Sequence, residues 1–234
     1  MIVVDKWMRF APNQFLSFSP KQTNSVAQEL KDGVGSLGAL ITYHRTDSNK
    51  MKDSEVKKLT PILLDFIKLM NEKYEDFLYV FHSTKAQRSN LEKIINKSQI
   101  NNTEIISDDK IKDHILKKSI FAVSKSGTIS LEISKRKIPS IIIYKMNFIN
   151  FLIVKMLVKI KYANILNIAA GQMIIPELLQ SKCNPKEIYK LVSSFLEDQN
   201  KIKKQISNTE KVLESFRTKN LPTDLAADSL RKSL

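Results

Sequence analysis

Apolar residues in the middle of the chain follow two spacings, one typical of helices and one typical of strands. Between residues 53 and 73 they recur every three or four positions, which predicts a long helix. Short apolar runs predict strands at residues 39–43, 77–82, 103–106, 120–124 and 140–144. The stretches between them predict helices at residues 86–97, 108–118 and 128–136. Strands that alternate with helices indicate a parallel sheet covered on both faces, so the predicted fold class is α/β.

The pattern changes at both ends of this region. Residues 1–37 mix aromatic and polar side chains and contain a glycine cluster, which predicts an irregular segment or linker. Residues 38–183 are predicted to form one Rossmann-like domain. Its last part is predicted to be helical after residue 147, with a brief extended piece near residues 163–166 and a helix that includes residues 176–180. Residues 184–234 are polar and rich in lysine, and they predict a C-terminal tail of two or three helices.

Composition narrows the classes of function. The chain has one cysteine, Cys183, which excludes an internal disulfide and fits a reducing compartment. Its three histidines lie far apart in sequence, so we predict no metal site and no cofactor. The net charge of +14 comes mainly from lysine, and it fits either an AT-rich coding bias or attraction to an anionic membrane surface. Nucleic acid is not a predicted partner, because arginine forks and aromatic stacking stripes are missing.

Membrane insertion is not predicted. The first ten residues are too short an apolar stretch for a signal peptide, and no apolar run reaches the ~18 residues that span a bilayer. We therefore expect a cytoplasmic protein. Phenylalanine and leucine residues mix with four lysines through residues 145–161, which predicts either a basic amphipathic helix lying on a membrane or a core helix whose lysines extend to solvent.

Two of the chain's five glycines mark candidate binding loops. Gly127 separates a predicted strand from a predicted helix, where unpaired N–H groups and the hydroxyls of Ser126 and Thr128 would suit a diphosphate. The alternative is a plain turn with Thr128 as N-cap. Glu132 lies one turn further on, where its carboxylate would accept both ribose hydroxyls or would simply stabilise the helix dipole.

Gly171 lies in a second candidate loop. It is flanked by Asn167 and Gln172, whose amide side chains would contact a uracil or phosphate edge. The alternative is that these two amides serve only as turn and capping residues. Neither loop, taken alone, distinguishes a binding site from an ordinary connection.

Taken together, these segments resemble the donor site of lipid-A-disaccharide synthases. The resemblance extends without a gap from the Ser126–Glu132 run, through Ile138-Pro139 and residues 142–146, to the Asn164–Gly171 loop and residues 175–180. A weaker resemblance covers residues 53–125. The resemblance to the family implies a GT-B fold of two Rossmann-like domains, of which this chain would be the carboxy-terminal, UDP-binding one.

The resemblance also implies a reaction and residue roles. The family transfers 2,3-diacylglucosamine from UDP-2,3-diacylglucosamine to 2,3-diacylglucosamine 1-phosphate in lipid A biosynthesis. Glu132 would hold the ribose, Ser126, Gly127 and Thr128 would line the diphosphate site, and Asn167 would contact the donor. Substrates with acyl chains imply a cytoplasmic protein that is peripheral on the inner face of the inner membrane.

The sequence also departs from the family. The chain has Leu40–Arg45 where the family has a Leu-Pro-Gly-Ser-Arg turn, although Arg45 is still expected to reach the diphosphate. Gln172 and Lys145 stand where arginine is usual, and each change removes a bidentate phosphate contact.

The family's amino-terminal domain has no counterpart in residues 1–37, so the catalytic base is unassigned. The chain is therefore expected to be a truncated or split form, or a piece completed by a second chain. Two alternatives remain open at this stage. One is a non-catalytic module that binds a UDP-sugar, and the other is a different GT-B glycosyltransferase that uses UDP-N-acetylglucosamine.

Overall fold

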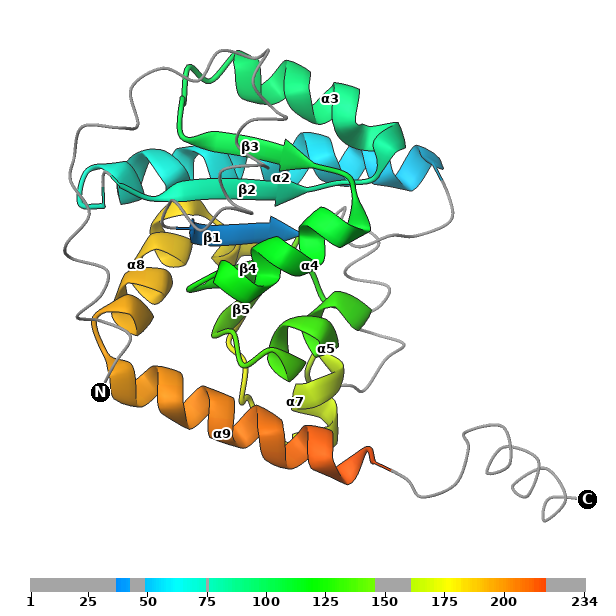
Figure 1. The fold of residues 1–234 in the computed structure, drawn as a ribbon, viewed down its shortest axis with the longest axis vertical. Coiled ribbons are helices and arrows are strands. Elements are labelled where there is room, and N and C mark those ends of the chain that lie inside the picture. Colours follow the sequence, from blue (N-terminus) through cyan, green and yellow to red (C-terminus); the bar gives the residue numbers. More distant parts are fainter. Residues whose placement is uncertain (1–36, 43–48, 75, 146–160, 218–234) are drawn as a thin grey trace, which may run out of the picture.

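The computed structural model describes residues 37–42, 49–74, 76–145 and 161–217 (Figure 1). Within these ranges six parallel strands form one sheet in the order β3-β2-β1-β4-β5-β6. The strands are β1 (Leu37–Thr42), β2 (Leu78–His82), β3 (Thr103–Ile106), β4 (Ala122–Ser124), β5 (Ser140–Tyr144) and β6 (Glu177–Leu179). This is the strand order of a Rossmann fold, and the predicted α/β class is confirmed.

Helices connect the strands and cover the sheet on both faces (Figure 1). They are α2 (Asn49–Asn71), α3 (Lys85–Asn96), α4 (Asp109–Lys118), α5 (Thr128–Lys135), α7 (Ile165–Ala170), α8 (Pro185–Leu196) and α9 (Gln199–Ser215). A short 3-10 turn, η1 (Gln180–Lys182), follows β6. No helix in the described ranges is long and apolar enough to cross a bilayer.

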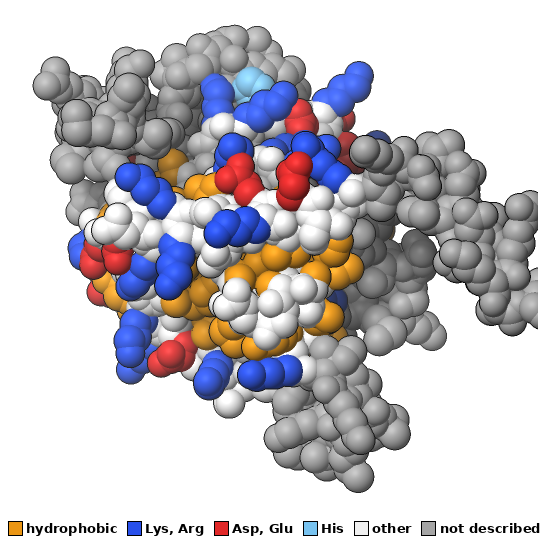
Figure 2. Space-filling view, turned by 90° about the horizontal axis from the view of Figure 1, so that it is seen from below, with side chains coloured by type: hydrophobic (Ala, Val, Ile, Leu, Met, Phe, Trp, Pro, Cys, Tyr) orange, Lys and Arg blue, Asp and Glu red, His pale blue; other side chains and the backbone are white. Residues whose placement is uncertain are grey.

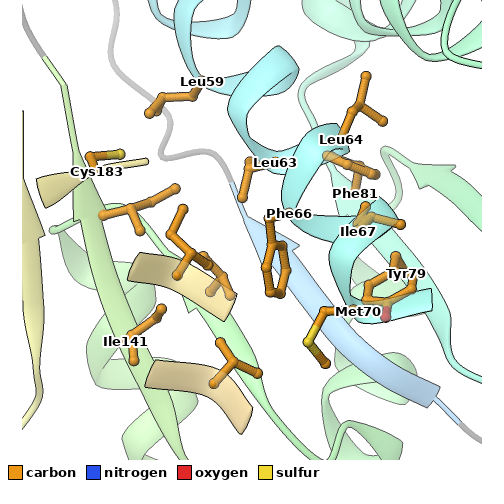
Figure 3. Close-up of a cluster of buried hydrophobic side chains, with 14 of the residues drawn as sticks. Leu59, Leu63, Leu64, Phe66, Ile67, Met70, Tyr79, Phe81, Ile141 and Cys183 are labelled. Atoms are coloured by element: carbon orange, nitrogen blue, oxygen red, sulfur yellow. The ribbon is translucent and has the colours of Figure 1, made fainter. Parts of the chain in front are cut away.

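Alternate residues of β2, β3 and β4 contribute to two separate cores, as the pleat of a strand requires. Tyr79 and Phe81 of β2 point into the main core, where they meet Leu63, Phe66 and Ile67 of α2 (Figure 3). Val80, between the two aromatic residues, packs with α4 and α5 on the opposite face. Both faces of β2 and β4 are therefore buried, which explains why these two strands lie in continuous apolar runs of the sequence.

Helix α8 belongs to the main core. Ile188, Val192 and Phe195 of this helix are buried together with side chains of α2 and β5. The sequence-based division between residues 183 and 184 stays a prediction. In the structure, α8 packs on the same sheet as the helices before it. The two helices α8 and α9 lie within the region where two or three were expected.

Two predictions for the last part of the sheet were wrong. Residues 163–166 were expected to be extended, but α7 starts at Ile165 because the Asn164 side chain accepts a hydrogen bond from the Leu166 N–H and caps the helix. Residues 176–180 were expected to be helical, but Glu177–Leu179 form β6. Pairing with β5, in which Ile142 N donates to Pro176 O at 2.8 Å, outweighs the local pattern.

Candidate functional site

The strand order creates a switch point between β1 and β4. From β1 the chain adds β2 and β3 on one side, and from β4 it adds β5 and β6 on the other. In sheets of this kind, ligands bind where the loops after the two central strands separate, at their carboxyl ends. The loop after β1, which contains Arg45, lies outside the described residues. The loop after β4 consists of Lys125, Ser126 and Gly127 and leads directly into α5.

Gly127 gives this loop a conformation that other residues rarely adopt. Its φ of 149° and ψ of −169° lie in a region that is essentially restricted to glycine. Gly127 occupies the N-cap position of α5 and has no side chain with which to cap it, so Thr128 is the first helical residue and not the N-cap. The first turn of α5 therefore presents N–H groups to the carboxyl edge of the sheet, as an anion-binding helix start does.

Hydrogen bonds join this loop to the segment before α7. Ser126 Oγ donates to Ala163 O at 2.6 Å, and Ser130 Oγ donates to Gly127 O at 2.7 Å. Asn164 Nδ2 in turn donates to Ser130 Oγ at 2.9 Å. The fold thus brings the loop around Gly127 into direct contact with the segment before α7, the helix that ends at Gly171.

Asn167 is a structural residue in this geometry. It is buried, its Nδ2 donates to Ile175 O and to Glu177 Oε1, each at 2.7 Å, and its Oδ1 accepts from the N–H groups of Ile174 and Ile175. An asparagine amide has two donor hydrogens and two acceptor lone pairs, and all four are used. The Asn167 amide therefore has no hydrogen-bonding group left for a bound ligand, and instead it fixes the turn between α7 and β6.

Glu177 is the centre of this network, and the sequence reasoning did not single it out. Its carboxylate accepts hydrogen bonds from Ala163 N at 2.8 Å and Asn164 N at 2.9 Å, besides the one from Asn167. Only 7% of the residue is exposed. A lone glutamate inside the apolar run of residues 174–179 was the available signal. This buried carboxylate thus positions two groups that hold the loop after β4: the Ala163 carbonyl, which accepts from Ser126, and the Asn164 side chain, which donates to Ser130.

Glu132 lies one turn into α5 with 40% of its side chain exposed, and it is held by α4. Lys112 Nζ lies 3.1 Å from Glu132 Oε2 and 3.4 Å from Asp109 Oδ1. His82, the last residue of β2, lies 3.9 Å from Asp109. Burial and the nearby Lys112 charge lower the pKa of His82. These partners of Glu132 come from β2 and α4, so its local sequence gave no sign of them.

The remaining polar groups complete the description of this edge. Ser124 ends β4 with a buried hydroxyl that makes no hydrogen bond among the described residues. Lys125 is buried, and its ammonium group lies 5.2 Å from the centre of the Tyr144 ring. Gly171 closes α7 in the left-handed conformation, and the exposed Gln172 follows it. No cluster of potential metal ligands occurs in the part of the chain that the structure describes.

Comparison with known proteins identifies the family. The family described as lipid-A-disaccharide synthetase matches residues 50–228. The lipid-A-disaccharide synthase of a Sulfurihydrogenibium species is 34% identical over 173 residues, which are 70% of this chain and 45% of the relative. That of Persephonella marina is 36% identical over 163 residues, which are 69% of this chain and 43% of the relative. The chain thus spans less than half the length of these two relatives.

Solved structures agree on the fold. WaaG, a glycosyltransferase involved in lipopolysaccharide biosynthesis, has a TM-score of 0.53 at 11% identity, with 93% of this chain and 53% of that chain covered. Anabaena HepE in complex with UDP and glucose has a TM-score of 0.51 at 12% identity, with 83% and 48% covered. At these identities the likeness concerns the fold alone. The family match and the relatives together confirm the resemblance seen in the sequence, and the chain belongs to the lipid-A-disaccharide synthase family.

Proposed function

We propose that this chain supplies the donor-binding half of a lipid-A-disaccharide synthase. The reaction transfers 2,3-diacylglucosamine from UDP-2,3-diacylglucosamine to 2,3-diacylglucosamine 1-phosphate, and it yields a β-1,6-linked disaccharide and UDP. The observation that carries the proposal is the start of α5, a helix N-terminus with Gly127 at its N-cap position at the switch point of the sheet, and with Glu132 one turn later.

The first turn of α5 suits the diphosphate of the donor. The partial positive charge of a helix N-terminus attracts phosphate oxygens, and glycine lets them approach the backbone closely. Ser126 and Thr128 lie on either side of Gly127 and would add hydroxyl contacts. Ser126 Oγ donates to Ala163 O without a ligand, so its hydroxyl would have to rotate away from that carbonyl to donate to the phosphate. Arg45 is proposed to approach the leaving diphosphate from the loop after β1.

Glu132 is proposed to accept hydrogen bonds from the ribose hydroxyls. It lies on the same helix as the diphosphate site, and 40% of its side chain is open to solvent. Asn167 is proposed to support the donor site indirectly, because its amide holds the turn that leads into β6. Gln172 is exposed beside that turn, where its amide would contact the uracil or a phosphate edge.

Catalysis needs more than this donor site. A glycosyl transfer requires donor and acceptor to be held together, and a base near the attacking hydroxyl. The matched region corresponds to less than half of the relatives. We therefore place the acceptor site and the catalytic base in the family's other half, supplied by the same polypeptide or by a second chain.

The acylated substrates suggest a position on the membrane. We propose that the protein is cytoplasmic and binds peripherally to the anionic inner face of the inner membrane. The net charge of +14 favours attraction to anionic lipid. Ile165, Ile168 and Met173, beside the candidate site, are 45–56% exposed. Figure 2 shows lysine and arginine side chains around apolar ones on the face viewed from below.

Calorimetric titration with UDP tests the donor site. The unaltered chain should bind UDP weakly but measurably, and Glu132→Ala should weaken binding about tenfold, because a hydrogen bond to a charged group contributes about 1.5 kcal/mol. Glu214→Ala is the matched control, since Glu214 is exposed on α9 and, among the described residues, its ion pair is with Arg217, three positions along the chain. Equal UDP affinity for Glu132→Ala and Glu214→Ala would contradict the ribose contact.

An assay with both acylated substrates separates the alternatives. Disaccharide formation, by this chain alone or after addition of the family's other half, would support the synthase. UDP binding without transfer under either condition would favour a module that only binds a UDP-sugar. Binding of UDP-N-acetylglucosamine without any response to the acylated donor would favour a different GT-B glycosyltransferase.

A further inference from the structure

Lys112 is held between two carboxylates at the edge of the sheet where the candidate site lies. Its side chain is only 14% exposed, whereas the side chains of Glu132 and Asp109 are 40% and 81% exposed. Its ammonium group lies 3.1 Å from Glu132 Oε2 and 3.4 Å from Asp109 Oδ1. Lys112 is therefore the less mobile partner of the pair and links α4 to α5.

This ion pair affects Glu132 in two ways. An exposed glutamate samples several rotamers, and contact with a largely buried ammonium group restricts it to those that keep Oε2 beside Lys112. Oε1 has no hydrogen bond among the described residues, so it remains available as an acceptor. The positive charge also offsets the negative charge of Glu132, which would otherwise repel a diphosphate bound at the start of α5.

We propose that Lys112 is a positioning residue that holds the Glu132 carboxylate ready for a ribose hydroxyl. Discrimination between a ribonucleotide and a 2′-deoxyribonucleotide then depends on Lys112, although the lysine itself does not contact the sugar. This inference rests on the proposed function, because it requires that UDP binds at the start of α5. It adds a residue from α4 to a site that otherwise consists of the loop after β4, α5 and the segment around α7.

The test compares UDP with 2′-deoxy-UDP by calorimetry in the unaltered chain, Lys112→Met, Lys112→Arg and Lys117→Met. Lys117 is the matched control, because it lies on the same helix and pairs with Asp113, away from Glu132. The unaltered chain and Lys117→Met should prefer UDP by about tenfold, the effect of one charge-assisted hydrogen bond. Lys112→Met should reduce this preference to about twofold or less, and Lys112→Arg should restore most of it.

The preference ratio separates positioning from a general effect on folding, which would weaken both nucleotides equally. In the Glu132→Ala background, Lys112→Met should leave the ratio unchanged, because the lysine acts through that carboxylate. A Lys112→Met variant that binds UDP and keeps the full preference would overturn the inference while leaving the proposed function intact. Failure of the unaltered chain to bind UDP would instead overturn the proposed function, and this inference with it.

Discussion

His82 is a residue whose ionisation reports on the charges around Glu132. Burial and the Lys112 charge lower its pKa, while Asp109 and Glu132 raise it. We predict a His82 pKa below 6.5 in the unaltered chain and a higher value in Lys112→Met, because removing a nearby positive charge favours the imidazolium form. Glu132→Ala should shift the pKa in the opposite direction. Titration of the histidine resonances by NMR measures both changes, with Lys117→Met as a control that should leave the His82 pKa unchanged.

The same pKa has a consequence for stability. A histidine whose pKa is lower in the folded than in the unfolded state binds fewer protons when folded. Its contribution to the free energy of unfolding is therefore retained above pH 6.5 and lost as the pH falls below that value.

A His82 resonance that titrates at the same pH in the unaltered chain and in Lys112→Met would show that the two side chains do not interact.

Glu104 on β3 carries a different pH dependence. Burial raises its pKa to about 7 from the ordinary 4.5. The folded state therefore holds a proton that the unfolded state releases, and stability falls as the pH rises from 4.5 to 7. We predict that Glu104→Gln stabilises the protein at pH 8 by about 1–3 kcal/mol, with a smaller gain at pH 5. Urea unfolding at the two pH values measures this, and equal gains at both would contradict it.

Among the secondary-structure elements, those buried on both faces of the sheet could be predicted from the sequence. The run 140–144 is apolar because both sides of β5 are covered, so its pattern is unambiguous. β6 has only three residues, and one of them is the buried Glu177, so no local pattern marks it as a strand. Its conformation depends on pairing with the backbone of β5, which lies more than thirty residues earlier in the sequence. It also depends on the side chain of Asn167, which belongs to α7.

The candidate site divides in the same way. Ser126, Gly127, Thr128 and Glu132 lie within seven consecutive residues, and so one stretch of sequence was enough to associate them with a phosphate and a ribose. Lys112 acts on Glu132 from a different helix, and this pairing exists only after the sheet has brought α4 and α5 together. Asn167 was singled out for its amide, but burial gives that amide internal partners in place of a ligand.

The two glycines of these loops make a matched pair of tests. Gly171 has a φ of 64°, and a Cβ added there would meet nothing within 4 Å, so Gly171→Ala should cost only about 1 kcal/mol. Gly127 lies at φ 149° and ψ −169°, and Gly127→Ala should cost about 1–3 kcal/mol or displace the loop. We predict that Gly127→Ala abolishes measurable UDP binding and that Gly171→Ala retains it. Thermal unfolding and calorimetry test both variants, and unchanged UDP affinity in Gly127→Ala would exclude the start of α5 as the diphosphate site.

For the molecule as a whole, α9 closes the part of the sheet that β6 is too short to cover. β6 begins to pair with β5 at Ile142, which leaves the backbone of Ser140 without a strand neighbour on that side. Gln205 of α9 fills the place, because its Oε1 accepts from Ser140 N and its Nε2 donates to Ser140 O, both at 2.8 Å. A side-chain amide thus substitutes for a peptide group. Lys137 and Glu210 add an ion pair between the turn after α5 and α9 at 2.6 Å.

This substitution predicts a stability defect without a binding defect. Gln205→Ala leaves a buried N–H and a buried C=O unpartnered, and should lower the free energy of unfolding by about 2–4 kcal/mol. Ser207→Ala is the control, since Ser207 is exposed on the same helix and alanine favours helix by a few tenths of a kcal/mol. Ser140 lies at the amino end of β5, whereas α5 begins at the carboxyl edge, so UDP affinity below the unfolding transition should change less than about twofold. Urea unfolding and calorimetry on the same preparations measure the two quantities. A stability equal to that of Ser207→Ala would mean that water replaces the Gln205 amide and that the other contacts of α9 hold this helix in place.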